Sequence, residues 1–321
     1  MDSSNVDPEL LPALSALKQL WGDTAMDLSD LAAARQTLDA MSAQKNSMAP
    51  VIDGVQSSRQ VIHNEQMDLD VVVYVHKPTA PSATVRSALL HFHGGGFVTG
   101  SATHNESQLR QMVKRFNCVV VSVDYRLAPE HPFPAALYDG FTALQWLHSS
   151  NEILNIDPQK IVVFAESAGA GLAAGLSLYA RDHSDIEIAQ QILLYPMLDH
   201  RNVAAPTATL EDTVIWSREN NQFAWSAYLG KGVDDSMLAY ASPSYAHDLK
   251  GLPPSYVCVG DIDLYYGESI DFVEKLAAAQ VSAKLDVYPG AYHAFQVAMP
   301  DAAVSQQCLQ KLDDVLTQAL A

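Results

Sequence analysis

The chain has 321 residues, of which 48% are hydrophobic and 17% charged, a composition typical of a globular protein with a substantial core. Its formal net charge of −18 repels polyphosphates and anionic headgroups, so nucleic acid and charged membranes are not expected partners. No apolar run approaches the ~20 residues of a membrane span, and residues 1–7 lack the basic and apolar regions of a secretory signal. We therefore expect a cytoplasmic protein.

The N-terminal part, residues 1–50, is predicted to form two helices, each with one apolar face. The residues of the two faces are Leu10, Leu11, Leu14 and Leu17 in the first helix, and Leu28, Leu31, Leu38 and Met41 in the second. Short helices of this kind are marginal alone. Both are expected to pack onto the rest of the protein.

From Gln66 onward, apolar strands alternate with helical segments. The expected strands are 69–75, 87–93, 118–123, 160–164, 191–195, 256–259 and 284–288. The expected helices are 108–116, 135–149, 168–174, 268–279 and a closing helix to Ala321. Several strands are apolar on both faces, and this alternation predicts an α/β protein whose mostly parallel sheet is covered by helices on both sides.

The alternation breaks between Asp199 and about Ala239, where no strand is expected. This insertion carries aromatic residues at helical spacing: Trp216, Phe223, Trp225 and Tyr228. An aromatic stripe commonly belongs to a core. Here it follows the carboxyl end of a strand, where ligands bind in open α/β sheets, so a lid is the alternative hypothesis.

Two motifs point to chemistry. Glycines 94–96 follow the predicted strand 87–93, and their backbone N–H groups are not screened by side chains. Ser167 follows the predicted strand 160–164 and opens a helix of small residues, which is the context of a nucleophile elbow. Either motif alone also fits an ordinary turn or close helix packing. Together, in this order, they are typical of lipases and esterases of the α/β-hydrolase fold.

A serine nucleophile needs a base, and the base needs an acid that fixes its tautomer. The order in this fold is Ser, then acid, then His. His293 follows the predicted strand 284–288 in a loop with Pro289 and Gly290, and is the expected base. Asp261 and Asp263 both follow the strand 256–259. The residues alone do not separate them: one should bind His293, and the other should cap the next helix or brace the loop.

From about Leu89 to Phe295 the chain resembles bacterial carboxylesterases of the hormone-sensitive-lipase-like family. The matching segments are HGGGF at 93–97, DYRLAPEHPFPAA at 124–136, ESAG at 166–169, YPMLD at 195–199 and GDIDL at 260–264. Two positions depart from the usual pattern. Ala165 stands where glycine is common, and its small side chain should be tolerated. Glu166 replaces the Asp or Thr often found beside the serine, which leaves the subgroup open.

The resemblance implies an α/β-hydrolase fold with an α-helical cap, formed by residues 1–50 and the insertion 199–239, over a core of residues 51–198 and 240–321. It favours Asp263 over Asp261 as the acid. It implies oxyanion donors at Gly94, Gly95 and Ala168, braced by His93 and residues 124–130.

We therefore predict a serine carboxylesterase that hydrolyses small neutral esters of short to medium acyl chains through an acyl-enzyme of Ser167, without metal or organic cofactor. An amidase, lactonase or deacetylase would use the same triad, and a ligand-binding receptor that lost catalysis is a further alternative. The expected partner is a small-molecule ester, and a homo-oligomer is left open. Cys118, Cys258 and Cys308 lack metal-ligand spacing and should be buried free thiols.

Overall fold

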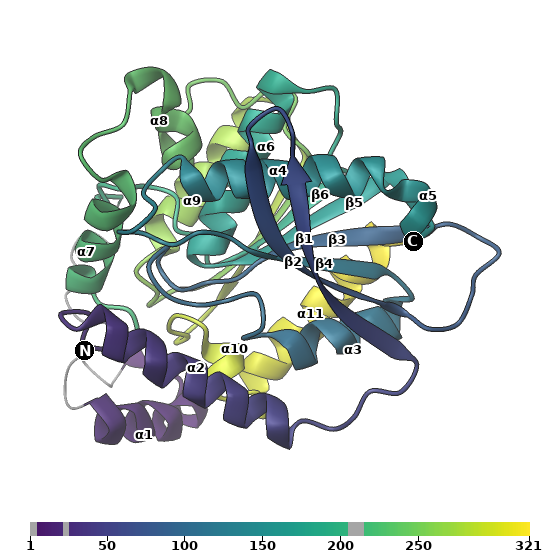
Figure 1. The fold of residues 1–321 in the computed structure, drawn as a ribbon. Coiled ribbons are helices and arrows are strands. Elements are labelled where there is room, and N and C mark those ends of the chain that lie inside the picture. Colours follow the sequence, from purple (N-terminus) through teal and green to yellow (C-terminus); the bar gives the residue numbers. More distant parts are fainter. Residues whose placement is uncertain (1–4, 22–25, 205–214) are drawn as a thin grey trace.

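The computed structural model describes residues 5–21, 26–204 and 215–321 (Figure 1). Within these ranges eight strands form one sheet, in the order β1-β2-β4-β3-β5-β6-β7-β8. The strands are β1 (Val55–Asn64), β2 (Leu69–Pro78), β3 (Arg86–Phe92), β4 (Val119–Asp124), β5 (Ile156–Glu166), β6 (Gln190–Leu194), β7 (Ser255–Gly260) and β8 (Ala283–Tyr288). β2 pairs antiparallel with β1 and β4, and all other neighbours are parallel. The predicted mostly parallel sheet is confirmed.

Helices cover both faces of this sheet. α4 (Ala135–Ser149), α6 (Ala168–His183) and α9 (Tyr266–Ala278) pack on one face, and α3 (Glu106–Phe116) and α11 (Ala303–Ala319) on the other (Figure 1). The shorter elements are η2 (Pro8–Leu10), α5 (Asn151–Leu154), α8 (Asp235–Ala241), η4 (Pro243–Tyr245) and α10 (Phe295–Ala298).

The central strands are largely apolar because they supply two cores at once. Side chains alternate across a strand, so Val119 and Val121 of β4 enter the core under α4 and α6, whereas Val120 enters the core under α3 and α11. All three are fully buried. The parallel central strands all end at the same edge of the sheet, so the loops that follow them meet there.

β1 was not predicted, because its sequence gives no apolar alternation. It lies at one edge of the sheet, opposite β8, and pairs only with β2 among the described residues. Val55 and Ile62 are its buried residues, and most of its other side chains are exposed. A polar edge strand of this kind is held by its backbone ladder and discourages pairing with other chains.

The two N-terminal helices pack in different places. α1 (Leu11–Trp21) and η2 bury Leu10 and Leu14 in the core that contains Tyr292 and Phe295, behind the loop after β8. α2 (Leu31–Met48) instead contacts the loop between β3 and α3, through hydrogen bonds to the carbonyls of Val98, Thr103 and His104. The apolar face predicted for this second helix is wrong at Met41, which is 41% exposed.

Among its described residues, the insertion after Asp199 contains no strand, and its helices are joined by turns and irregular segments. Residues 205–214 of the predicted 199–239 segment lie outside the described residues, and α7 (Arg218–Leu229) follows them. Trp225 and Tyr228 are buried in the core, whereas Phe223 is 37% exposed. Among the described residues, no helix has both the length and the apolar character needed to cross a membrane.

Candidate active site

Ser167 sits at the sharp turn between β5 and α6, at the carboxyl edge of the sheet. Its backbone has φ 54° and ψ −122°, a conformation that non-glycine residues rarely adopt. Two hydrogen bonds hold the turn: the Ser167 N–H donates to the Leu194 carbonyl at 2.9 Å, and the Met197 N–H donates to the Ser167 carbonyl at 3.1 Å. A Cβ at Gly169 would lie 2.3 Å from the Phe92 carbonyl oxygen, so only glycine allows this approach of helix and strand.

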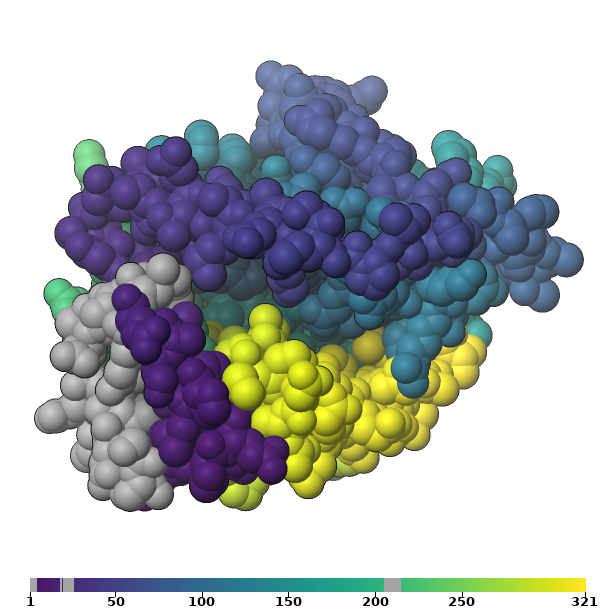
Figure 2. All heavy atoms as spheres, turned by 90° about the horizontal axis from the view of Figure 1, so that it is seen from below, coloured from purple at the N-terminus to yellow at the C-terminus, as the bar shows by residue number. Residues whose placement is uncertain are grey.

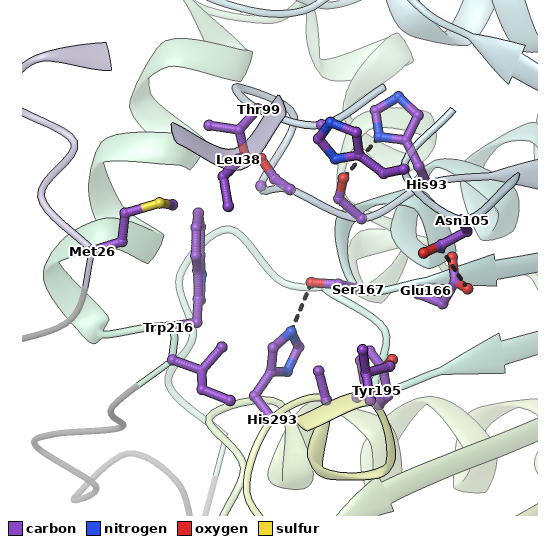
Figure 3. Close-up of a pocket in the computed structure, with 18 residues that line it drawn as sticks. Met26, Leu38, His93, Thr99, Asn105, Glu166, Ser167, Tyr195, Trp216 and His293 are labelled. Carbon is purple, nitrogen blue, oxygen red and sulfur yellow. Dashed lines mark hydrogen bonds between the residues drawn. The ribbon is translucent and has the colours of Figure 1, made fainter. Parts of the chain in front are cut away.

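The structure brings the three expected catalytic side chains together. The Ser167 Oγ lies 3.0 Å from the His293 Nε2, and the His293 Nδ1 lies 2.8 Å from the Asp263 Oδ2 (Figure 3). The other oxygen of Asp263 accepts a hydrogen bond from the Tyr265 N–H at 2.9 Å. Asp263 is fully buried, and Ser167 and His293 are 7% and 6% exposed. The hydrogen bond to this buried carboxylate fixes the imidazole orientation and leaves Nε2 as the atom that faces the serine.

Asp261 makes a different contact. Its Oδ1 accepts a hydrogen bond from the Gly290 N–H at 2.7 Å, and its own N–H donates to the Tyr288 carbonyl at 3.1 Å. The carboxylate therefore ties the end of β7 to the loop that carries His293. This matches the bracing role that the sequence left open for one of the two aspartates.

The peptide groups of the glycine loop are oriented by two neighbours. The Tyr125 hydroxyl donates to the His93 carbonyl at 2.7 Å, and the His93 Nδ1 donates to the Gly94 carbonyl at 2.8 Å. In a trans peptide the carbonyl and the next N–H point in opposite directions, so these bonds aim the Gly94 and Gly95 N–H groups the other way. Burial lowers the pKa of His93 to about 3 and keeps the ring neutral.

These N–H groups are available to a ligand. Across the described ranges, nothing in the protein accepts a hydrogen bond from the N–H of Gly94, Gly95 or Ala168. A Cβ at Gly94 would lie 3.3 Å from the Ser167 Cβ, so the loop runs directly beside the serine. Ala168 begins α6, whose N-terminal dipole adds to the attraction for negative charge. The geometry suits an oxyanion that forms beside Ser167.

Ser167 and His293 open onto a cavity of about 240 Å³ at the strand ends. Figure 3 shows Met26 and Trp216 across the cavity from Ser167, with Leu38 above. These three residues come from the N-terminal segment and the insertion. Figure 2 shows the face where the N-terminal segment, in purple, borders a hollow with the C-terminal segment, in yellow, opposite. The apolar lining contrasts with the polar reacting groups.

One polar network beside the nucleophile was not predicted. The Glu166 Oε2 lies 3.0 Å from the His91 Nε2, and the Glu166 Oε1 accepts a hydrogen bond from the Asn105 side chain at 3.2 Å. The His91 Nδ1 lies 2.8 Å from the Ser122 hydroxyl, and His91 is fully buried. The available signal was a histidine within an otherwise apolar strand. This network holds the Glu166 carboxylate at the cavity wall.

Comparison with known proteins agrees with this geometry. A family model described as the alpha/beta hydrolase fold matches residues 89–297. The esterase LipI of Mycobacterium tuberculosis is 33% identical over 245 residues, which cover 71% of this chain and 74% of LipI. The carboxylesterase NlhH of Mycobacterium tuberculosis is 32% identical, over 73% of this chain and 75% of NlhH. The solved structure of a bacterial heroin esterase covers 100% of both chains, with a TM-score of 0.92 and 34% identity.

A serine at a strained elbow, beside a histidine and free backbone donors on a mostly parallel sheet, is the arrangement of a serine hydrolase. The chain belongs to the α/β-hydrolase fold family. The resemblance to hormone-sensitive-lipase-like carboxylesterases that its motifs predicted is confirmed by these relatives.

Proposed function

We propose that the protein is a serine carboxylesterase that cleaves small neutral esters through an acyl-enzyme on Ser167. The observation that carries this proposal is the hydrogen-bonded series Ser167, His293 and Asp263 beside unpaired backbone N–H groups. The relatives named esterase and carboxylesterase support the same reaction.

In the acylation step, the Ser167 Oγ attacks the ester carbonyl carbon while its proton passes to the His293 Nε2. The carbonyl oxygen becomes an oxyanion, stabilised by the N–H groups of Gly94, Gly95 and Ala168. Asp263 stabilises the imidazolium through Nδ1. The tetrahedral intermediate then breaks its bond to the alcohol oxygen, which takes the proton from Nε2 and leaves as the free alcohol.

In the deacylation step, water replaces the alcohol. His293 removes a proton from this water, whose oxygen attacks the acyl carbon of the ester on Ser167. The same backbone donors stabilise the second oxyanion. The intermediate breaks its bond to the Ser167 Oγ, which regains its proton from His293, and the carboxylic acid departs.

The cavity supports a preference for small neutral substrates. Its volume of about 240 Å³ suits short to medium acyl chains, and Met26, Leu38 and Trp216 provide an apolar wall. The Glu166 carboxylate at the opposite wall and the net charge of −18 both disfavour anionic esters. We assign residues 1–50 and 199–239 to a cap over a core of residues 51–198 and 240–321, because both cap segments contribute to this wall.

We place the enzyme in the cytoplasm. Cys118, Cys258 and Cys308 are buried and unpaired, a state that a reducing compartment preserves.

The test is hydrolysis of p-nitrophenyl butyrate, with butyryl p-nitroanilide as the matched amide. The wild type should cleave the ester and be at least about 10³-fold slower on the amide, because the poorer leaving group raises the barrier by roughly 4 kcal/mol. Ser167→Ala should lower turnover by about 10⁶. Retention of more than about a hundredth of wild-type turnover by a folded Ser167→Ala variant would contradict the nucleophile assignment, and faster cleavage of the amide would favour an amidase.

A further inference from the structure

One face of α2 is polar and lies against the loops at the active site. Its residues recur every three or four positions, which places them on one side of the helix. Asp39 and Ser42 contact His104. The side chain of Asn46 donates to the Thr103 carbonyl at 2.9 Å. Arg35 contacts the loop after the oxyanion glycines. In chain order these residues are Arg35, Asp39, Ser42 and Asn46.

Arg35 makes four hydrogen bonds with its guanidinium group. Its Nε donates to the Val98 carbonyl at 2.7 Å, and its Nη2 donates to the Ala128 carbonyl at 2.8 Å. Its Nη1 and Nη2 also contact the two carboxylate oxygens of Glu130, each at 2.8 Å. The hydrogen bond from Arg35 lowers the pKa of Glu130 to about 2, so the pair is ionised at neutral pH.

The two carbonyls belong to the two segments that shape the oxyanion loop. Val98 lies in the turn that closes on Gly95, where the Val98 N–H donates to the Gly95 carbonyl at 3.1 Å. Ala128 lies in the segment that begins with Tyr125, whose hydroxyl holds the His93 carbonyl at 2.7 Å. The Ala128 N–H also donates to the Phe97 carbonyl at 2.9 Å. Arg35 is therefore bonded to both the loop and its brace.

We propose that Arg35 is a positioning residue for the esterase reaction: its planar guanidinium fork locks the 95–99 turn to the 125–130 segment and so holds the Gly94 and Gly95 N–H groups in register. This inference rests on the proposed function. It gives α2 a part in the chemical step in addition to its part in the cavity wall. The planar guanidinium can donate hydrogen bonds to several acceptors in one plane, whereas the compact ammonium group of lysine cannot.

The expected effect lies mainly on the rate of the chemical step. Misplacing catalytic groups by about 1 Å costs roughly 10² in rate, and removing one oxyanion donor costs 10²–10³. In Arg35→Ala the donors remain but lose their alignment, so kcat for p-nitrophenyl butyrate should fall by about 10- to 100-fold. KM should change less than about threefold on the same argument, because the ground-state carbonyl gains less from the donors. Arg35→Lys should stay at least about fivefold below wild type, since the ammonium group replaces only part of the fork.

An inhibitor provides a readout that a merely structural role would not move. A trifluoromethyl ketone forms a hemiketal oxyanion on the serine, so its Ki in each variant should rise by about the factor by which kcat/KM falls. Lys45 is an exposed cation on the same helix. Lys45→Ala should therefore match wild type in kcat, KM and the Ki of the trifluoromethyl ketone. Asn46→Ala breaks only the contact with Thr103 and should lower kcat far less than Arg35→Ala.

Active sites are counted by the end point of fluorophosphonate labelling, so misfolded protein is not mistaken for slow enzyme. The proposal is overturned if Arg35→Ala keeps kcat within twofold of wild type, if only KM changes, or if Arg35→Lys is fully active. It is also overturned if Asn46→Ala loses as much kcat as Arg35→Ala, because the helix would then act as a whole. None of these outcomes bears on the esterase proposal. That proposal fails separately if a folded Ser167→Ala variant remains active.

Discussion

Asp261 and Asp263 hold the His293 loop from two sides: the Asp263 Oδ2 lies 2.8 Å from the His293 Nδ1, while the Asp261 Oδ1 accepts from the Gly290 N–H at 2.7 Å. Two carboxylates two positions apart therefore meet different groups of one loop. Asp263 contacts the imidazole ring, and Asp261 contacts the backbone.

Asp263→Asn should lower kcat by about 10⁴, because the amide favours the wrong histidine tautomer. Asp261→Asn should cost less than about tenfold, since its amide oxygen still accepts from Gly290 and the loss of charge affects only a brace. The measurement is kcat on p-nitrophenyl butyrate for both variants, with circular dichroism as the control for folding. If the two sensitivities were reversed, the catalytic acid would be Asp261.

Gly95→Ala should lower turnover by roughly 10² or more, the size of one displaced oxyanion donor. The Gly95 φ is +121°, and an added Cβ would lie 2.2 Å from the Thr99 carbonyl oxygen, so the loop must move. Gly232→Ala is the matched control: its φ is +120°, but an added Cβ meets nothing within 4 Å. Near-normal turnover of Gly95→Ala would show that this part of the loop does not face the reacting oxygen. An equal loss of turnover in Gly232→Ala would show that backbone strain alone lowers activity.

The sequence predicted those parts of the site that are contiguous motifs at strand ends. Ser167 and the glycine loop follow apolar strands directly, so the parallel sheet places them at one edge. The distinction between Asp261 and Asp263 came only from the resemblance, because it depends on how the turn after β7 directs each side chain. Their catalytic roles stay predictions until the variants are measured.

The missed features depend on contacts between distant segments. Arg35 meets Val98, Ala128 and Glu130 across 63 to 95 residues, and no local pattern encodes that pairing. The apolar periodicity of α2 predicted a buried position for Met41, which is exposed. It gave no sign that the polar face of this helix packs against the loop between β3 and α3. β1 was missed because an exposed edge strand needs few apolar residues.

Buried neutral histidines should make the fold sensitive to mild acid. Burial lowers the pKa of His76 to about 4 and that of His93 to about 3. The unfolded chain binds protons near pH 6.5 while the folded protein does not, so stability is full above that pH and falls as the pH drops toward these folded values. Each histidine contributes a slope of up to about 1.4 kcal/mol per pH unit.

Urea unfolding between pH 7.5 and 4.5 checks this prediction. His76→Gln removes one contribution to this slope, so its free energy of unfolding should fall less steeply with decreasing pH than that of wild type. His247→Gln, at an exposed position, serves as the control and should keep the wild-type slope. Parallel curves for His76→Gln and wild type would show that His76 does not contribute.

The N-terminal helices are predicted to shape the acyl site. Met26 and Leu38 line the cavity, so deletion of residues 1–48 should widen it and expose an apolar wall. We expect lower activity, a shift of the acyl-chain profile toward longer nitrophenyl esters, and aggregation, because uncovered apolar patches of several hundred Å² favour association. The deletion also removes contacts behind the catalytic loop, where the Tyr292 hydroxyl donates to the Leu10 carbonyl at 3.2 Å.

A point variant separates these two effects. Leu38→Ala shortens one cavity residue and leaves α1 in place, so it should shift the acyl-chain profile in the same direction as the deletion without the loss of contacts around Tyr292. Met41→Ala, one helical turn along α2 and 41% exposed, should keep the wild-type profile. Specificity constants for acetate to decanoate esters measure the shift. If the deletion and Leu38→Ala lowered thermal stability but left the profile unchanged, the N-terminal helices would only support the fold, because a wall that contacts the acyl chain must alter the ratio of long to short substrates.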